Sequence, residues 1–178
     1  MRIKTLFILI LIFTLSACDR KANISSPLKY DKQNISFSYP SNWEVSDENN
    51  TNVRLLIIST SSNAVLMIHI FKGSEAPTLK SFSQYLSKSI SKEMPFGDMK
   101  TESFNSIKKQ VASDQWTGII EKVSVKLLAI NVPHEREYYT LNKNNKQAFF
   151  TTQIMTDEKP LSQDGFDLIL KTFNLNAE

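Results

Sequence analysis

Residues 53–71 read VRLLIISTSSNAVLMIHIF, and this stretch decides the fold. Two runs of β-branched and aliphatic residues, 53–60 and 64–71, flank the polar triplet Ser61-Ser62-Asn63. Runs of this kind, separated by turn-forming residues, are typical of two strands joined in a β-hairpin. Because the strands of a hairpin pair in opposite directions, the stretch predicts a fold organised around an antiparallel sheet.

Further strands are predicted on both sides of this hairpin. Ile35–Tyr39 alternates apolar and polar residues with period two, and the following PSN segment ends it as a turn. Towards the C-terminus, strand-like segments lie at residues 101–107, 115–122, 138–141 and 147–155. The polar run NKNNK between the last two segments predicts a turn there.

The segment 123–134 (VSVKLLAINVPH) is apolar over most of its length and admits two interpretations. Its β-branched composition favours a buried core strand. If the segment is exposed instead, Leu127, Leu128, Ile130 and Val132 form an apolar protrusion suited to a protein partner.

Two segments change to helical periodicity. In residues 78–94 the apolar side chains that share one helix face are Leu79, Phe82, Leu86 and Ile90. In residues 162–173 they are Phe166, Ile169, Leu170 and Phe173. Thr78 is the expected N-cap of the first helix, and Pro95 with Gly97 ends it. The order of strands, helix, strands and helix indicates an α+β fold with a central antiparallel β-sheet flanked by helices.

The N-terminus has the layout of a secretory signal peptide. Arg2 and Lys4 form a short positive region, and an apolar run (LFILILIFTL) occupies residues 6–15. This run is about half of the roughly 20 residues that a bilayer-spanning helix needs. The segment is therefore predicted to be processed rather than kept as a permanent membrane span.

The motif LSAC at residues 15–18 resembles the lipobox of bacterial lipoproteins. The resemblance implies cleavage after Ala17 and covalent lipid on Cys18, and two or more acyl chains anchor a protein stably in a membrane. Asp19 resembles the sorting signal that retains such proteins at the periplasmic face of the inner membrane, with the outer membrane as the alternative. Cys18 is the only cysteine, so none remains for a disulfide or a thiolate metal site.

The sequence divides into three predicted parts. Residues 1–17 are the signal peptide, and residues 18–33 are the lipidated cysteine with a polar, pattern-free stretch that predicts a flexible tether. Residues 34–176 are the folded domain. The formal net charge is +3, of which Arg2 and Lys4 supply two charges. The nearly neutral remainder argues against nucleic-acid binding, which needs a concentrated basic face.

Two short motifs bound the predicted domain. It opens with FSYPSNW at residues 37–43 and closes on a helix containing ILKTF at residues 169–173. With the element order, these motifs resemble the PsbP-like superfamily, which includes the extrinsic photosystem II protein, DcrB-type bacterial lipoproteins and a eukaryotic Ran-binding import factor. The resemblance implies a central antiparallel sheet with helices on both sides. It implies no functional residue at a matched position, and Trp43 is interpreted as a packing residue rather than an exposed binding anchor.

No catalytic, cofactor-binding or metal-binding residue is predicted. The serines lack a GxSxG nucleophile elbow, and the two histidines are too far apart in sequence for a zinc motif. His69 lies inside an apolar strand and is interpreted as a partly buried, hydrogen-bonded histidine. His134, within the charged run PHERE, is interpreted as solvated surface.

The remaining charged residues are also assigned to the surface. The acidic pairs Asp47-Glu48 and Asp157-Glu158 are expected in loops and lack the ligand spacing of a calcium site. Five lysines are expected around one edge of the sheet, where charge discourages aggregation, with an anionic-ligand patch as the alternative. They are Lys100, Lys108, Lys109, Lys122 and Lys126.

Together these features predict a membrane-anchored periplasmic lipoprotein with a non-enzymatic, protein-binding or accessory role in the cell envelope. An immunity or inhibitor protein is one version of that role. The predicted partners are the membrane, through the lipid, and another protein. The alternative is a small-ligand or ion-binding receptor, or a weak hydrolase, that uses a groove between sheet and helix.

Overall fold

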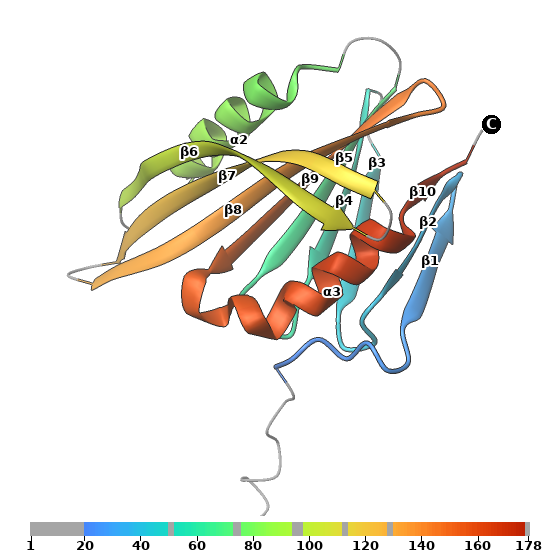
Figure 1. Ribbon diagram of the computed structural model, residues 1–178, viewed down its shortest axis with the longest axis horizontal. Helices are drawn as coiled ribbons and strands as arrows, with labels where there is room; N and C mark the ends of the chain where they lie inside the picture. Colours follow the sequence, from blue (N-terminus) through green and yellow to red (C-terminus); the bar gives the residue numbers. More distant parts are fainter. Residues whose placement is uncertain are drawn as a thin grey trace, which may run out of the picture.

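The computed structural model describes residues 20–49, 52–72, 76–93, 98–111, 114–127 and 130–176. The predicted signal peptide, Cys18 and Asp19 lie outside the described residues, as do Pro95 and Gly97. The described chain forms a large antiparallel sheet with one helix on each face and a small second sheet beside it (Figure 1).

The large sheet has seven strands in the order β3-β4-β5-β9-β8-β7-β6, and every neighbouring pair is antiparallel. Their bounds are β3 Glu44–Asn49, β4 Val53–Ser59, β5 Val65–Lys72, β6 Asp98–Val111, β7 Asp114–Leu127, β8 Ile130–Lys143 and β9 Lys146–Met155. The predicted hairpin is confirmed as β4–β5, with Leu55 opposite His69.

The small sheet has the order β1-β2-β10 and corrects the prediction of a tether through residue 33. Its strands are β1 Leu28–Lys32, β2 Ile35–Tyr39 and β10 Asn174–Leu175. Tyr30 of β1 is buried and stacks on Phe37 at a ring distance of 4.9 Å. Ala22 is also buried, and its N–H donates to the carbonyl of Leu161. The described residues before Asn34 are therefore part of the folded domain. The polar sequence of β1 concealed the strand, because only one of its five side chains faces inward.

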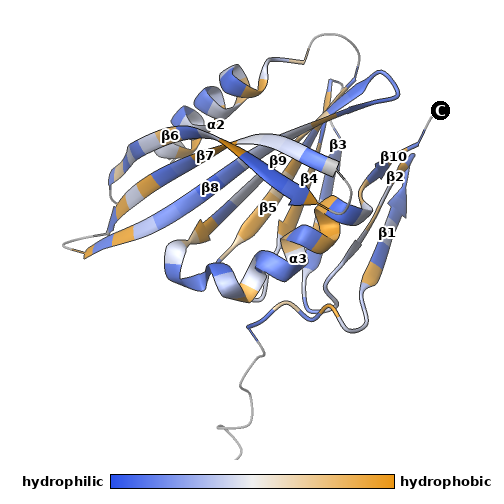
Figure 2. Cartoon of the chain, in the orientation of Figure 1, coloured by the Kyte–Doolittle hydropathy of each residue, from blue (hydrophilic) through white to orange (hydrophobic). Residues whose placement is uncertain are grey.

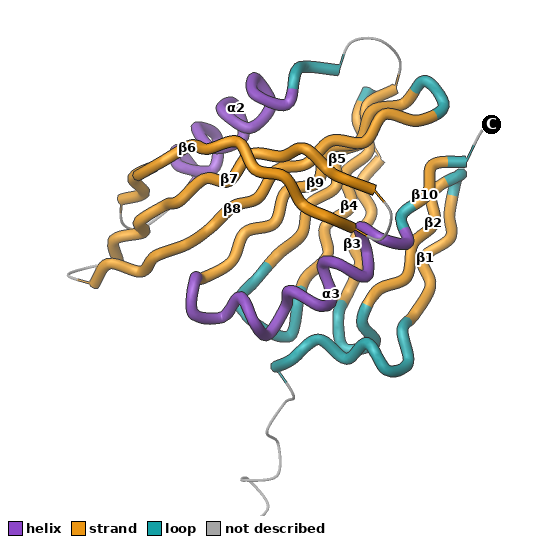
Figure 3. The backbone as a smooth tube through the Cα atoms, in the orientation of Figure 1, coloured by secondary structure: helices purple, strands orange, loops and turns teal. Residues whose placement is uncertain are grey.

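Two α-helices cover opposite faces of the large sheet (Figure 3). Helix α2 (Leu79–Glu93) packs over β6, β7 and β8, and the predicted N-cap is confirmed because Thr78 Oγ1 accepts the Ser81 N–H at 3.2 Å. Helix α3 (Lys159–Thr172) follows the short 3₁₀ helix Thr156–Glu158 and contacts β2, β6 and β9. It begins three residues before the predicted start, because Pro160 occupies the first turn, where its missing N–H costs no hydrogen bond.

The main core lies on the α3 face of the sheet and joins both sheets to α3. The predicted inward residues Phe166, Ile169 and Leu170 of α3 are buried, and so is Phe173, which follows the helix as its C-cap. Trp43 is 3 % exposed and packs on Phe166 at a ring distance of 5.2 Å, which confirms its packing role.

The interpretation of residues 123–134 as one core strand is wrong, because the segment is divided between two antiparallel strands. Residues up to Leu127 complete β7 and residues from Ile130 begin β8, so the segment is the end of a long hairpin. Val123 and Val125 are buried, whereas Ile130 is 67 % exposed. Val123 and Val125 therefore agree with the core interpretation and Ile130 with the exposed one, whereas Leu128 lies outside the described residues.

Candidate functional site: an apolar groove beside helix α2

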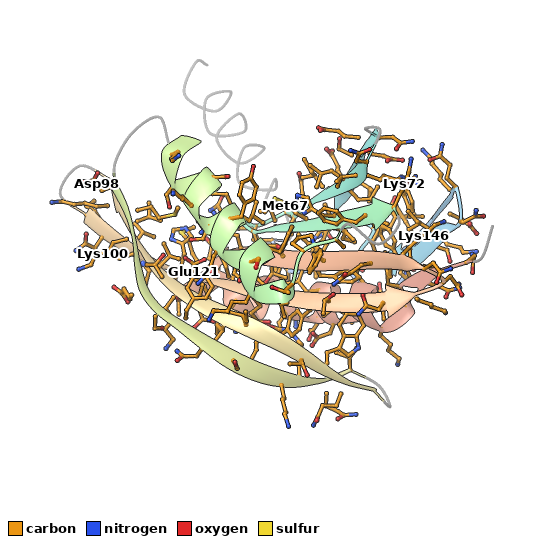
Figure 4. All side chains as sticks on the ribbon, turned by 90° about the horizontal axis from the view of Figure 1, so that it is seen from above. Met67, Lys72, Asp98, Lys100, Glu121 and Lys146 are labelled. Atoms are coloured by element: carbon orange, nitrogen blue, oxygen red, sulfur yellow. The ribbon has the colours of Figure 1, made fainter. Side chains whose placement is uncertain are left out.

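Strands β4 and β5 are apolar on both faces, although the described chain covers only one of them with a helix. Leu56, Ile58, Leu66 and Ile68 are fully buried on the α3 face. The alternating residues on the other face, among them Ile57 and Met67, are only half-buried. Since α2 packs over β6, β7 and β8, it lies beside this half of the sheet rather than on it. Figure 2 shows the concentration of apolar residues on β4 and β5, and Figure 4 shows Met67 beside α2.

An open groove runs between α2 and the exposed face of β4 and β5, with a volume of about 570 Å³. We call it the α2 groove. Its lining comprises Val53, Leu55, His69, Phe71, Pro77, Ser81, Phe82, Tyr85 and Leu86. None of these residues carries a carboxylate, and the polar side chains among them are Ser81, His69 and Tyr85. Apolar pockets with few polar groups are the usual binding sites for apolar side chains and ligands.

His69 is one of the polar residues that line the α2 groove. Its ring packs edge-on against Phe82 at 5.1 Å, and its Nδ1 is buried without a hydrogen-bond partner among the described residues. The predicted partial burial of His69 is confirmed, whereas its Nδ1 lacks a hydrogen bond because the neighbouring side chains are apolar. Burial lowers the pKa of His69 from 6.5 to about 4, so the ring is neutral at pH 7.

The groove is bordered by an exposed aromatic residue, and two exposed acidic residues lie on the neighbouring edge strand β3. Tyr85 of α2 is 72 % exposed, although its neighbour Phe82 is buried. On edge strand β3, Glu44 and Glu48 are exposed and lie opposite Ser59 and Leu55. Both carboxylates therefore face the same side of the sheet as the groove. The sequence patterns did not indicate Tyr85 or these acidic residues as site residues. The only signal was that β4 and β5 are apolar at successive positions, which indicates strands covered on both faces.

A second cluster of functional groups lies beneath α2 and is closed. Glu121 is fully buried, and its Oε1 accepts hydrogen bonds from Ser87 (2.6 Å) and Thr101 (2.5 Å). Its Oε2 accepts from Tyr138 (2.7 Å) and Arg136 (3.3 Å). Because all four bonds come from the helix and the surrounding strands, this network holds α2 on the sheet. An unpaired charge there would be strongly destabilising.

The charged run 133–137 is not the solvated surface that the sequence predicts. It lies within β8, so alternate side chains enter opposite faces of the sheet. Arg136 joins the Glu121 network, whereas Glu135 and Glu137 both accept hydrogen bonds from Lys159 on the α3 side. His134 is half-buried, and its Nδ1 lies 3.0 Å from the carbonyl of Val132.

The first acidic pair lies on a strand rather than in a loop. Asp47 belongs to β3 and forms a bidentate pair with buried Arg54, at 3.0 and 2.8 Å. Hydrogen bonds from Arg54 lower the pKa of Asp47 below its ordinary value. Burial, with a hydrogen bond to Asp47, raises the pKa of Tyr30 to about 12. The second pair, Asp157-Glu158, lies in the 3₁₀ helix, where Glu158 pairs with Arg20.

The predicted position of five lysines near one edge of the sheet is confirmed. Lys100, Lys108 and Lys109 lie on edge strand β6, and Lys122 and Lys126 lie on the adjacent strand β7. Lys109 also pairs with Asp167 of α3 at 2.8 Å. Within the described residues, no group of three or more metal-ligating side chains converges. No helix in the described part of the chain has the length and apolarity needed to cross a bilayer.

The sequence and the fold were compared with those of known proteins. No family model and no curated protein matches the sequence. The solution structure of the cyanobacterial PsbP protein (CyanoP) from Synechocystis sp. PCC 6803 matches with a TM-score of 0.55 and 13% identity, over 86% of this chain and 94% of that chain. Two further structures are similar at lower scores. The Ran-binding protein Mog1p of Saccharomyces cerevisiae has a TM-score of 0.46 and 9% identity over 85% of this chain and 96% of its own. LpqN of Mycobacterium tuberculosis, involved in cell envelope biogenesis, has a TM-score of 0.44 and 8% identity over 85% of this chain and 90% of its own. The likeness to CyanoP shows that this chain has a PsbP-like fold.

Proposed function

We propose that this protein is a lipid-anchored accessory protein of the bacterial envelope that binds another protein without catalysing a reaction. The observation that carries the proposal is the apolar face of β4 and β5 beside α2, which no helix of the described chain covers. Exposed apolar patches bordered by polar residues are typical of protein-binding sites. The lipobox motif supports attachment through Cys18, and Asp19 supports the periplasmic face of the inner membrane.

The proposed occupant of the α2 groove is an amphipathic helix of the partner protein. Strands β4 and β5 are adjacent, and neighbouring strands lie about 4.8 Å apart, so the uncovered face is roughly as wide as one helix packed beside α2 at 8–10 Å. An apolar stripe on that helix would fill the groove and contact Tyr85. Basic residues on its flank would face Glu44 and Glu48, which gives the orientation of the helix through charge complementarity.

The experiment is a pull-down from detergent-solubilised envelopes with the lipidated chain, followed by titration of the identified partner segment as a peptide. Tyr85→Ala is expected to weaken binding at least about tenfold, because exposed tyrosines at apolar grooves are typical interaction hot spots. Glu44→Lys with Glu48→Lys is expected to weaken it further and to reduce its salt dependence. Gln84→Ala is the matched control, since Gln84 is exposed on the same helix.

Two results would contradict this proposal. One is a partner peptide that binds Tyr85→Ala and the wild type equally. The other is native mass spectrometry that finds a small apolar molecule in the groove and no protein partner, which would favour the receptor alternative. A Cys18→Ala chain that still sediments with membranes would contradict the proposed lipid anchor.

A further inference from the structure

The first described residues are bound to one end of the large sheet. The carbonyl of Arg20 accepts a hydrogen bond from Ser61 Oγ at 3.1 Å, and its guanidinium pairs with Glu158. Two residues later, Ala22 is buried and its N–H donates to the carbonyl of Leu161. These contacts lie where β4 ends and β5 begins, and we call this the Arg20 end of the sheet. Figure 4 shows the two ends of the sheet, marked by Asp98 of β6 near the Arg20 end and Lys146 of β9 at the other.

The connection from this end to the proposed lipid is very short. Only Asp19 lies between Arg20 and Cys18 in the sequence. Two residues span at most about 7 Å, whatever conformation they adopt. Lipid on Cys18 therefore holds the backbone of Arg20 close to the headgroups of the bilayer. This step rests on the lipid anchor of the proposed function.

An exposed apolar side chain lies at the same end of the sheet. His134 of β8 is opposite Met155, the last residue of β9, so the four residues of β8 before His134 extend about 13 Å beyond β9. Ile130 is the first of these four residues and is 67 % exposed. Contact with lipid would remove this apolar surface from water. Figure 1 shows the first described residues and the end of the β7–β8 hairpin projecting from the lower and lower left edges of the molecule.

The basic residues at the start of the described chain already have acidic partners. Arg20 pairs with Glu158, and Lys21 lies 3.6 Å from Asp164. The exposed residue of the β4–β5 turn is the neutral Asn63. Attachment of this end to a bilayer therefore needs no anionic lipid, because the covalent lipid and an apolar contact supply it.

We propose that the Arg20 end lies directly on the bilayer surface, with Asn63 at the level of the headgroups and Ile130 in contact with lipid. The domain then has one orientation on the membrane instead of turning freely on a tether. In that orientation the α2 groove is away from the bilayer. Its nearest β4 residue, Leu55, is five residues before Thr60, about 17 Å along the strand. A partner helix in the groove would therefore lie outside the bilayer.

The test measures fluorescence quenching in the lipidated chain, reconstituted in phosphatidylcholine vesicles that contain a lipid with a nitroxide on its headgroup. Cys18, the only cysteine of the sequence, carries the lipid on its sulfur, so an introduced cysteine can be labelled with a fluorophore selectively. The labelled variants are Asn63→Cys and Ile130→Cys. The matched control is Asn142→Cys, because Asn142 is exposed like Asn63 but lies opposite Gln147, about 27 Å along β9 from Met155.

Quenching is expected to be at least about threefold stronger at positions 63 and 130 than at position 142, because of that distance along the sheet. Insertion of about 20 Gly and Ser residues after Asp19 supplies a flexible span of about 25 Å and should weaken quenching at position 63. Equal quenching at the three positions would overturn the proposal, as would quenching at position 63 without quenching at position 130. Quenching that the insertion leaves unchanged would also overturn it, because the short connection would then not hold the domain on the bilayer.

Flotation of the same vesicles distinguishes this proposal from the proposed function. A chain that does not float with the vesicles has no lipid anchor, and both proposals then fail. A chain that floats but is quenched equally at all three positions keeps its anchor, and only the docked orientation is overturned.

Discussion

At the residue scale, His69 combines a half-buried ring with an apolar environment, and this determines its charge state. Its Nδ1 has no hydrogen-bond partner among the described residues, and the other residues lining the α2 groove include no carboxylate that would stabilise a charged ring. Protonation would therefore place an uncompensated charge against Phe82. Burial lowers the pKa of His69 to about 4 for this reason.

Stability should therefore fall on acidification between about pH 6.5 and pH 4. In this window the unfolded histidine binds a proton and the folded one does not, so the unfolded state gains stability as the pH decreases. From pH 7 to pH 4.5 the free energy of unfolding should decrease by about 2 kcal/mol through His69 alone. Urea unfolding at the two pH values measures the change. His69→Gln should lose this component, and an identical pH dependence in that variant would show that other groups are responsible.

At the element scale, the turn that follows β2 packs against α3 and determines how closely the helix approaches it. Gly165 faces this turn, and a Cβ atom there would lie 2.4 Å from Trp43 Cη2 and 2.7 Å from Pro40 Cγ. The FSYPSNW motif and the closing helix therefore depend on each other. The motif places the Trp43 ring against α3, and the close approach requires glycine at position 165 of the helix. The motif and Gly165 are far apart in the sequence, so the sequence does not show that they are in contact.

Gly165→Ala should accordingly destabilise the protein, although alanine favours helices by about 1 kcal/mol over glycine. The added methyl group must displace Trp43 or α3, and overpacking of this kind costs about 1–3 kcal/mol. Thermal unfolding of the variant should show a lower melting temperature. Gln84→Ala, at an exposed position of α2, is the control and should leave the melting temperature nearly unchanged.

At the scale of the whole molecule, the small sheet closes the core on the far side of α3. Tyr30 donates a hydrogen bond to Asp47 (2.6 Å) and accepts one from Arg54 (2.7 Å), which ties β1 to β3 and β4 of the large sheet. Strand β10 pairs with β2 in register Leu175 to Ile35. The first and last described strands thus both flank β2 (Figure 1).

A chain that begins at Asn34 should consequently be much less stable than one that begins at Arg20. It loses β1, the Tyr30 ring and the hydrogen bonds to Asp47 and Arg54, and loss of a large buried aromatic residue alone costs about 3–5 kcal/mol. That is a large part of the roughly 5–15 kcal/mol that stabilises a typical domain. Urea unfolding of both chains tests this. Equal midpoints would mean that residues 20–33 are a dispensable tether after all.

The amino-acid sequence by itself determined the local elements and the class of fold. The β4–β5 hairpin, the N-cap of α2 and the inward face of α3 follow from short-range patterns, because periodicity and turn chemistry act over a few residues. The same patterns predicted an antiparallel sheet flanked by helices, a prediction that agrees with the PsbP-like fold.

Only the tertiary structure decided which faces of the sheet the helices cover and which charged side chains pair with one another. Strand β1 forms because Tyr30 stacks on Phe37 and accepts a hydrogen bond from Arg54. Glu121 can be buried because Arg136 and a residue of α2 donate hydrogen bonds to it. These contacts depend on strand order, which joins residues distant in sequence. The α2 groove exists for the same reason: β4 and β5 are apolar on both sides, and α2 packs over the other half of the sheet. Local sequence patterns carry no information about that placement.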